Sequence, residues 1–442
     1  MFGWFQPKCP LATGEKVWVE SRMAWLAEKL GYERLLKARV VEPTDEFFPG
    51  EYCGRAEDAE QIFQKVVRIM AVDPSRVKLR VRSDWTSSHP LGQYNSANPA
   101  LIEINPSQLQ DPESLVGTLA HEIAHEILLG GGLLQDNNED LERLTDLLPI
   151  FLGIGIFGAN SVVREQNFRE GRFSWWSMQK QGYLPQRMHA YGLALFAWLR
   201  NEHAPQWAGH LRLDVREPLH GGLKYLVKTN DCIFESQLQA PMSSLAMCLQ
   251  HLQHASPSFR LAALQGIIAL ETNATSGVAE IGRALTDRDA EVRGAAAQAL
   301  GVIGPPSVTL CRDLRKLLSD KAPEVRAAAV FALGEIRPAD SITSDLASLL
   351  RDTDRGVVGA SAEALGKIGA ADSRVVQELL RQYEYRLLKC DYHLIETIAL
   401  SLIQMLPNAA VAVDEHFAAH DGELRRFAQE SLAQAGIEQS QR

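Results

Sequence analysis

A repeat with a period of 33 residues fills the second half of the chain and limits the folds open to it. Three copies align with an arginine in the same position: HASPSFRLAALQGIIAL (254–270), DRDAEVRGAAAQALGVI (287–303) and DKAPEVRAAAVFALGEI (320–336). Each copy pairs an alanine-rich helix with a preceding, more polar one. Neither helix can bury its apolar stripe alone, so neighbouring copies must stack into an all-α solenoid.

The recurring pattern EVRxAAAxALGxI resembles the HEAT repeat, particularly the short bacterial form of phycobilin-lyase-type proteins. The resemblance covers residues 242–438 as about six helix pairs. It implies an α-solenoid that recognises a protein along a continuous surface. The repeated arginines, Arg260, Arg293 and Arg326, are expected to be structural, each reaching acidic residues and helix ends of the next repeat. A bilin lyase is a further implication, but nothing in the first 240 residues supports it.

Length and charge indicate two domains and argue against nucleic acid. A chain of 442 residues with 46% hydrophobic content exceeds the roughly 250–300 residues at which a single core stops growing. We therefore predict one domain over residues 1–240 and a second over residues 241–438, with the boundary in SQLQAP (236–241). The net charge of −10 argues against binding to phosphate backbones or anionic membranes, so nucleic acid is not an expected partner.

Nothing in the sequence indicates export or a membrane span. The six cysteines are scattered without a CxxC pair, which is typical of reduced thiols. Prolines interrupt MFGWFQPKCPLATG at the N-terminus, where a signal peptide needs an unbroken apolar core. The apolar stretch LLPIFLGIGIFGANSVV (147–163) falls short of the roughly 20 apolar residues that a bilayer requires, and we expect a buried core helix. A cytoplasmic location is the resulting expectation.

The N-terminal part has an α+β pattern. Residues 14–31 carry apolar side chains at helical spacing, VKLRVRS (77–83) alternates with period two, and ALIEI (100–104) predicts a short strand. A helix is then expected to begin at Asp111 as N-cap with Pro112 in the first helical position. This helix carries the sequence TLAHEIAHEILLGGG (118–132).

The HEIAH segment predicts a metal site. His121 and His125 are four residues apart and project from one face of the helix, with Glu122 beside them. Two imidazoles and a carboxylate are costly to bury without compensation, and a bound cation compensates all three. At this spacing both histidines can ligate Zn²⁺ while Glu122 reaches a water as general base. The alternative is a pair of core histidines satisfied by other hydrogen bonds.

A third ligand follows downstream. The helix that begins in NNEDLERLTDLLPIF places Glu142 and Asp146 four residues apart on one face. Glu142 can complete a His₂Glu zinc site, and Asp146 can accept a hydrogen bond from a ligating imidazole. Glu139 and Asp140 are competing acids, because acidic residues also gather at solvated helix N-termini. Glu126 is expected to be a surface carboxylate.

The sequence HEIAH, followed after 16 residues by ERLTD, resembles the gluzincin metallopeptidases. The resemblance covers the motifs within residues 77–150 and implies a zincin-like domain that hydrolyses peptide bonds with Zn²⁺ as cofactor. It departs from that family in lacking a recognisable substrate-binding edge-strand motif and a motif for the oxyanion-stabilising residue. Tyr183, His189 and Tyr191, near the start of the apolar helix 182–202, are candidates for that role, and Tyr191 is the one named for it. The stronger alternative is core packing, because aromatic residues at helical spacing usually pack in the core.

The expected fold class is therefore an α+β zincin-like N-terminal domain followed by an all-α HEAT-repeat solenoid. The expected function is zinc-dependent hydrolysis of a protein or peptide that the solenoid recruits. The alternative is a non-enzymatic interaction scaffold in which zinc braces the N-terminal fold. An open coordination position distinguishes the enzyme, because a structural zinc is closed by a fourth protein ligand.

Overall fold

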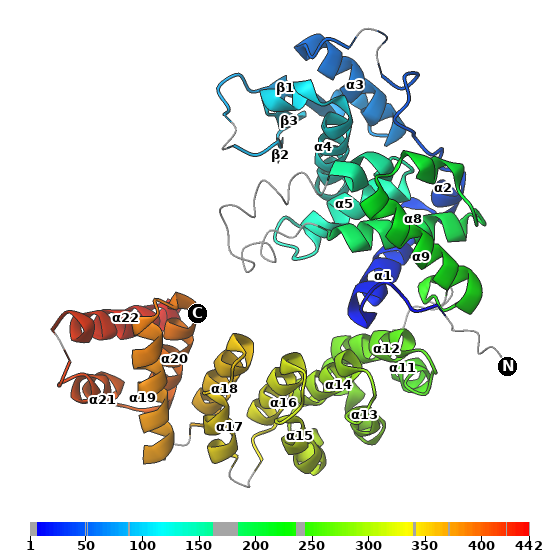
Figure 1. The fold of residues 1–442 in the computed structure, drawn as a ribbon. Coiled ribbons are helices and arrows are strands. Elements are labelled where there is room, and N and C mark those ends of the chain that lie inside the picture. Colours follow the sequence, from blue (N-terminus) through cyan, green and yellow to red (C-terminus); the bar gives the residue numbers. More distant parts are fainter. Residues whose placement is uncertain are drawn as a thin grey trace. The chain divides into compact units, whose positions relative to one another are not determined.

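The computed structural model describes residues 7–48, 50, 52–86, 89–161, 184–235, 244–338, 342–369, 372–420 and 422–441. The chain divides into two units, Met1–Pro241 and Met242–Arg442, and each has its own core (Figure 1). The predicted domain boundary, 236–241, lies outside the described residues, next to this division.

Helices make up most of the N-terminal unit. The α-helices are α1 (Thr13–Leu30), α2 (Tyr32–Lys37), α3 (Ala56–Ile69), α4 (Pro112–His125), α5 (Leu141–Phe151), α8 (Gln186–Leu199) and α9 (Leu213–Thr229). Short 3₁₀ turns lie at η1 (Pro74–Arg76), η2 (Pro106–Gln110) and η4 (Gln206–His210), and a π-helical turn, η3 (Glu126–Gly130), extends α4. The helix predicted over residues 14–31 is α1, so that prediction is confirmed.

One small sheet accompanies these helices. Its strands are β1 (Val77–Val81), β2 (Gly92–Asn95) and β3 (Ala100–Ile104), in the order β1-β3-β2. β1 runs parallel to β3, and β2 pairs with β3 in antiparallel register, Gly92 opposite Ile104. The two predicted strands are confirmed as β1 and β3. The α+β expectation holds only in this limited sense, because three short strands stand among many helices.

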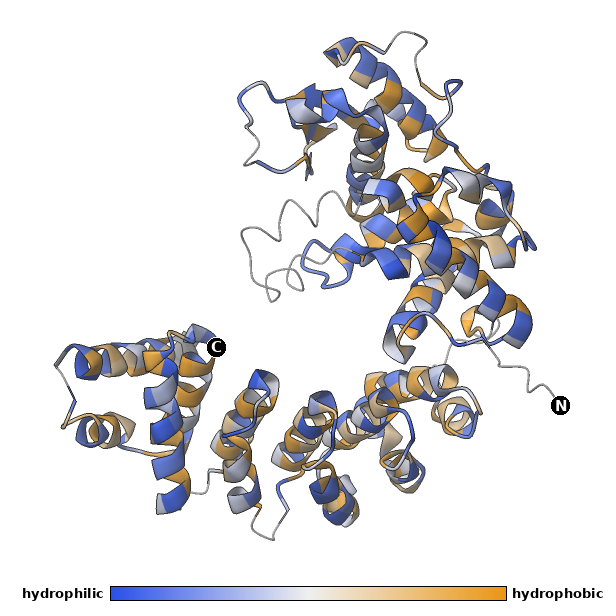
Figure 2. Cartoon of the chain, in the orientation of Figure 1, coloured by the Kyte–Doolittle hydropathy of each residue, from blue (hydrophilic) through white to orange (hydrophobic). Residues whose placement is uncertain are grey.

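The core of this unit lies between α1, α4, α5, α8 and α9. Figure 2 shows hydrophobic residues concentrated where α5 and α8 pack together. Leu119 and Ile123 of α4, Leu148 of α5 and Phe196 of α8 are all buried. The start of α4 is as predicted, since Asp111 accepts a hydrogen bond from the Ser114 amide at 3.2 Å and Pro112 follows it.

The apolar stretch 147–163 is described as far as residue 161, and most of this described part lies in the core. Its side chains are buried from residue 147 to residue 157, and the chain bends after α5 at Gly153, whose φ is +84°. This confirms the expectation of burial, although the single helix expected there is divided in two, with a second helical stretch at 155–161. No helix among the described residues combines the length and apolarity needed to span a membrane.

The C-terminal unit is a succession of helix pairs (Figure 1). The first helices of the pairs are α11 (Leu245–His251), α13 (Val278–Ala284), α15 (Cys311–Leu317), α17 (Thr343–Leu349), α19 (Ser373–Leu388) and α21 (Ala409–His416). The second helices are α12 (Pro257–Leu270), α14 (Ala290–Ile303), α16 (Pro323–Ile336), α18 (Arg355–Ile368), α20 (Tyr392–Met405) and α22 (Gly422–Gln441). Two 3₁₀ turns, η5 (Glu271–Gly277) and η6 (Pro305–Leu310), precede α13 and α15. The described residues thus contain the six predicted pairs.

The second helices pack directly on one another, α12 on α14 and so on through α22. The glycine of the ALG motif permits this close approach. A Cβ atom at Gly301 of α14 would lie 2.8 Å from Cα of Ala332, and one at Gly334 of α16 would lie 2.8 Å from Cβ of Ala364. The recurring Ala and Gly therefore reflect the distance between stacked helices.

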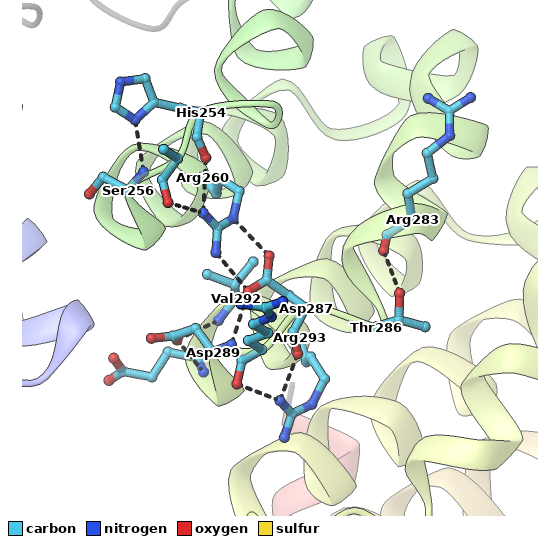
Figure 3. Close-up of polar contacts among 12 residues, drawn as sticks. His254, Ser256, Arg260, Arg283, Thr286, Asp287, Asp289, Val292 and Arg293 are labelled. Atoms are coloured by element: carbon cyan, nitrogen blue, oxygen red, sulfur yellow. Dashed lines mark hydrogen bonds and ion pairs between the residues drawn. The ribbon is translucent and has the colours of Figure 1, made fainter.

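The repeated arginines join consecutive repeats (Figure 3). The guanidinium of Arg260 donates two hydrogen bonds to Asp287, at 2.7 Å each, and a third to the backbone carbonyl of Ala255. The carboxylate of Asp287 in turn accepts a hydrogen bond from the backbone amide of Asp289, which precedes α14 in the next repeat. Arg293 repeats the arrangement with Asp320 at 2.9 Å. The structural role expected for these arginines is confirmed.

Arg326 continues this series by donating to Asp352 at 2.8 and 2.6 Å. In the next copy the equivalent position is Val358, and other arginines replace the missing contact. Arg351 pairs with Glu378, and Arg355 pairs with Asp391 of the following repeat. An arginine–carboxylate contact between neighbours is thus kept where the sequence pattern drifts.

Candidate metal site

Helices α4 and α5 bring His121, His125 and Glu142 together. One ligand atom from each of these residues lies within 4.8 Å of the others, and no other such group of His, Cys, Asp and Glu occurs among the described residues. Nε2 of His121 is 3.4 Å from one carboxylate oxygen of Glu142, and Nε2 of His125 is 3.8 Å from the other. The three predicted ligand positions therefore converge in space.

The local sequence explains this convergence. His121 and His125 lie one turn apart at the C-terminal end of α4, and the chain then widens into the π-turn η3. Gly132 has a φ of +71°, which glycine adopts without strain, in the connection to α5, and α5 packs against α4. Glu142 lies in the first turn of α5, so its side chain faces the two imidazoles.

Asp146 orients the first imidazole. It lies one turn after Glu142 on α5, and its carboxylate accepts a hydrogen bond from Nδ1 of His121 at 2.8 Å. The backbone amide of Leu184 donates to the other carboxylate oxygen at 2.9 Å. With its proton on Nδ1, His121 directs Nε2 toward Glu142, which is the orientation that a metal-binding imidazole requires.

The electrostatics of the site favour a cation. Burial lowers the pKa of His125 to about 4, and the neighbouring His121 adds to that effect, so His125 is neutral near pH 7. Burial also disfavours charge on His121, but its bonds to Asp146 and Glu142 raise its pKa well above the ordinary value. Burial works against ionisation of the Glu142 and Asp146 carboxyl groups, yet the contact with His121 lowers the pKa of each. The site therefore stabilises one positive charge between two carboxylates.

The donor set fits zinc. Tetrahedral zinc sites in proteins use imidazole nitrogens and carboxylate oxygens at about 2.0–2.2 Å, which separates neighbouring ligand atoms by roughly 3.3 Å. The separations of 3.4 and 3.8 Å from Glu142 to the two imidazoles are close to that value. All three ligand atoms lie within 4.8 Å of one another, so side-chain movements that shorten these separations to roughly 3.3 Å would place them on one ion.

Glu122 lies apart from the three ligand positions. Its side chain is buried and reaches β2, where a Cβ atom at Gly92 would lie only 2.7 Å from the Glu122 carboxylate. A side chain at position 92 would therefore displace the Glu122 carboxylate from its position beside β2. β2 forms one edge of the sheet, so the Glu122 carboxylate lies next to an edge strand.

The structure places Tyr191 in a different cluster. Tyr191 is fully buried and donates its hydroxyl hydrogen to Glu20 of α1 at 2.6 Å. Glu20 also accepts bonds from Lys16 and from the Ile233 amide. With its hydroxyl committed to this buried carboxylate, Tyr191 does not join the histidine group, and the role expected of it there has no support. The aromatic residue packs into the core, which was the alternative.

The other described candidates are not in the group that could hold a metal. Nδ1 of His189 contacts the Leu184 carbonyl at 3.1 Å, and the ring is buried. Tyr183 lies outside the described residues. Of the competing acids, Asp140 pairs with Arg22, and Glu139 is exposed. Neither belongs to the group that could hold a metal.

The expectation for Glu126 is wrong. This residue is only 4% exposed, and its carboxylate pairs with Arg76 at 2.5 Å and accepts the Tyr94 hydroxyl at 2.8 Å. The Tyr94 ring stacks on His125, with centroids 5.7 Å apart and planes inclined by 19°. Sequence reasoning missed Tyr94 because β2 is four residues long and has no apolar alternation. The signal for this group that the sequence does offer is Glu126, a second acidic residue directly after HEIAH.

Comparisons with known proteins bear on the C-terminal unit. Residues 245–310 and 312–386 match the family model for HEAT repeats. Among solved structures, an engineered protein is 19% identical, with 43% of this chain and 97% of that chain covered and a TM-score of 0.33. Kap95p, from a structure with RanGDP, is 12% identical, with 96% of this chain and 60% of that chain covered and a TM-score of 0.31.

Importin beta is similar at 13% identity, with 94% of this chain and 58% of that chain covered and a TM-score of 0.29. The chain therefore spans about three fifths of Kap95p and of importin beta. No curated protein matches the chain. These findings do not include a metallopeptidase, so the gluzincin resemblance stays an expectation. The stacked helix pairs and the matched family model together identify residues 245–386 as HEAT repeats.

Proposed function

We propose that this chain binds a protein partner through its HEAT repeats and holds one zinc ion at His121, His125 and Glu142. The observation that carries the zinc site is the convergence of three ligand atoms within 4.8 Å, with Asp146 bonded to Nδ1 of His121. A neutral His125 beside an oriented His121 supplies two imidazole nitrogens, and Glu142 supplies the carboxylate oxygen.

The repeat architecture supports the protein-binding part of the proposal. Stacked repeats present continuous rows of side chains, which suit extended partners better than a single pocket does. The net charge of −10 disfavours nucleic acid as the partner. The matched HEAT repeats extend over 245–386, so this surface is long enough to contact several segments of a partner.

Metal analysis of the purified full-length chain tests the zinc site. About one zinc per chain is expected, because imidazole and carboxylate ligands suit zinc under cellular conditions. His121→Ala and His125→Ala should each remove it. His210→Ala is the matched control, since His210 faces the Glu42 carboxylate at 3.0 Å elsewhere in the same unit. Full zinc content in both site variants would exclude this site.

A second candidate function is zinc-dependent hydrolysis of a peptide bond. Two observations favour it: the group that could hold the metal contains three protein residues, and Glu122 follows His121 directly in α4, with its carboxylate next to Gly92 of the edge strand β2. A bound zinc ion would supply Lewis acidity toward a carbonyl group and a water molecule. Glu122 would take a proton from the attacking water and give it to the leaving amine. The interaction scaffold stands without this activity.

A further inference from the structure

Three side chains that the proposed zinc site does not use form a connected group beside His125. Arg76 of η1 pairs with Glu126 at 2.5 Å, and Glu126 accepts the Tyr94 hydroxyl at 2.8 Å. The ring of Tyr94 then stacks on the His125 imidazole. We call Arg76, Glu126 and Tyr94 the His125 clamp.

The backbone after His125 is built to place Glu126 in this clamp. α4 ends at His125, and the chain continues as a π-turn, a form often found at functional sites. The Glu126 carboxylate folds over Gly130, where a Cβ atom would lie 2.2–2.6 Å from the carboxylate atoms. The same Arg76 nitrogen that pairs with Glu126 also donates to the Gly130 carbonyl at 2.7 Å. Gly130 is thus required for the observed position of Glu126.

The two histidines of the site are held in different ways. His121 is fixed by the hydrogen bond from its Nδ1 to Asp146. Nδ1 of His125 is buried and makes no hydrogen bond with any residue that the structure describes. Its ring is instead packed between Tyr94, at 5.7 Å, and the edge of His121, at 5.1 Å between centroids. Packing against an anchored aromatic ring therefore orients His125, whereas a hydrogen bond orients His121.

We propose that Tyr94 is a positioning residue that holds the His125 imidazole in its metal-binding orientation and is itself anchored by Glu126 and Arg76. This inference rests on the proposed zinc site. Stacking restricts rotation of the imidazole about its Cβ–Cγ bond, so Nε2 stays directed toward Glu142, 3.8 Å away. An imidazole that rotates freely must be ordered when the metal binds, which weakens affinity without removing a ligand.

Metal binding to the full-length chain tests the clamp through four variants. Tyr94→Leu removes the ring, Tyr94→Phe removes only the hydroxyl, and Glu126→Gln removes the charge that pairs with Arg76. Tyr52→Phe is the matched control, because the Tyr52 hydroxyl donates to the Leu109 carbonyl at 2.8 Å, a contact with no role in the clamp. Zinc affinity is measured by competition with a chromophoric chelator, and cobalt substitution reports coordination geometry through its visible absorption.

The expected results are graded. Tyr94→Leu should weaken zinc binding on the order of 10–100-fold, the range typical for residues that orient a ligand, and change the cobalt spectrum. Tyr94→Phe and Glu126→Gln should each weaken binding less, and their effects should not add, because both loosen the same anchor of the Tyr94 ring. Tyr52→Phe should match the wild type in both measurements.

The outcomes separate this inference from the zinc site itself. A wild-type chain that binds neither zinc nor cobalt overturns the proposed site and the clamp with it. Wild-type binding with unchanged affinity and cobalt spectrum in Tyr94→Leu overturns the clamp alone. If Tyr94→Leu fails to fold, Tyr94→Phe and Glu126→Gln decide, since both preserve side-chain volume. Unchanged binding in those two variants would then show that the Tyr94 hydroxyl and Glu126 do not anchor the ring on His125, which overturns the clamp.

Discussion

The carboxylate of Asp146 accepts a hydrogen bond from Nδ1 of His121 at 2.8 Å and another from the Leu184 amide at 2.9 Å. One side chain of α5 thereby connects α4 to the segment that precedes α8. The orientation of His121 therefore depends on how these helices pack, which links the proposed zinc site to the core of the N-terminal unit.

Asp146→Asn should lower zinc affinity on the order of 10–100-fold, because an amide holds the imidazole less strongly than a carboxylate does. Glu142→Gln should cost more, because it removes a proposed ligand. Chelator competition on the full-length chain measures both. Asp140→Asn is the control, since Asp140 precedes the same helix but pairs with Arg22 and Trp18. Equal affinity in Asp146→Asn and the wild type would contradict the role of Asp146.

Arg293→Ala should destabilise the repeats around α14 and α16. The substitution leaves the half-buried Asp320 without its two hydrogen bonds from the guanidinium. Hydrogen bonding to a charged group at a site of this kind contributes about 1.5–3 kcal/mol to stability. Hydrogen exchange of α14 and α16 localises the loss. Arg283→Ala, in the same repeat, changes an exposed side chain 3.9 Å from Glu280 and should stay within about 0.5 kcal/mol of the wild type (Figure 3). Equal protection in both variants would contradict the structural role of Arg293.

The same contacts predict acid sensitivity of the C-terminal unit. The bond from Arg293 lowers the pKa of Asp320 below its ordinary value of 3.8. Burial opposes ionisation of Asp352, but the Arg326 bond lowers its pKa as well. A lowered folded-state pKa gives stability that is present above the ordinary pKa and lost as the pH falls through the folded value. Protection of α14 and α16 should therefore fall below about pH 4 more steeply in the wild type than in Arg293→Ala. Parallel pH profiles would exclude this linkage.

Two glycines of the repeats should respond to alanine with opposite signs. A Cβ atom at Gly334 would meet Cβ of Ala364 at 2.8 Å, so Gly334→Ala must separate two packed helices, at a cost of about 1–3 kcal/mol. At Gly294 the nearest atom lies 3.8 Å away, and Gly294→Ala should stabilise α14 by roughly 0.5–1 kcal/mol. Urea denaturation of both variants provides the comparison. Destabilisation by both substitutions would show that helix spacing is not what distinguishes these positions.

The repeats could be predicted from the sequence because their period fixes both the helix pairs and the contacts between them. An arginine recurring every 33 residues has to meet the same neighbour each time, and Arg260 and Arg293 do so. The start of α4 could also be predicted from local sequence, because Asp111 and Pro112 specify a helix N-terminus without tertiary contacts.

Other features depend on tertiary contacts that the sequence does not display. β2 has four residues without apolar alternation, and its pairing with β3 defines it as a strand. Tyr94 reaches His125 only because of that pairing. The position of Tyr191 could not be predicted either, because an aromatic residue at helical spacing can face either a cleft or the core. The buried Glu20, 171 positions away in sequence, determines where its hydroxyl lies.

Glu122→Gln separates the hydrolase from the scaffold. If Glu122 transfers protons and does not ligate the metal, the variant should keep its zinc content and fold but lose roughly 10²–10⁴-fold in hydrolysis of a denatured protein substrate such as casein. The substitution preserves side-chain volume beneath Gly92, so a packing defect is not expected. Glu113→Gln is the control, because Glu113 is exposed in the first turn of the same helix.

Zinc content and hydrolysis are measured on the same preparations of wild type and both variants. Loss of zinc in Glu122→Gln would show that Glu122 is a ligand, which closes the coordination position that hydrolysis needs. A zinc-loaded wild type with no more activity than Glu122→Gln would remove the hydrolase candidate. The remaining function would then be a HEAT-repeat scaffold braced by zinc, for which His121→Ala should impair folding while Glu122→Gln leaves partner binding intact.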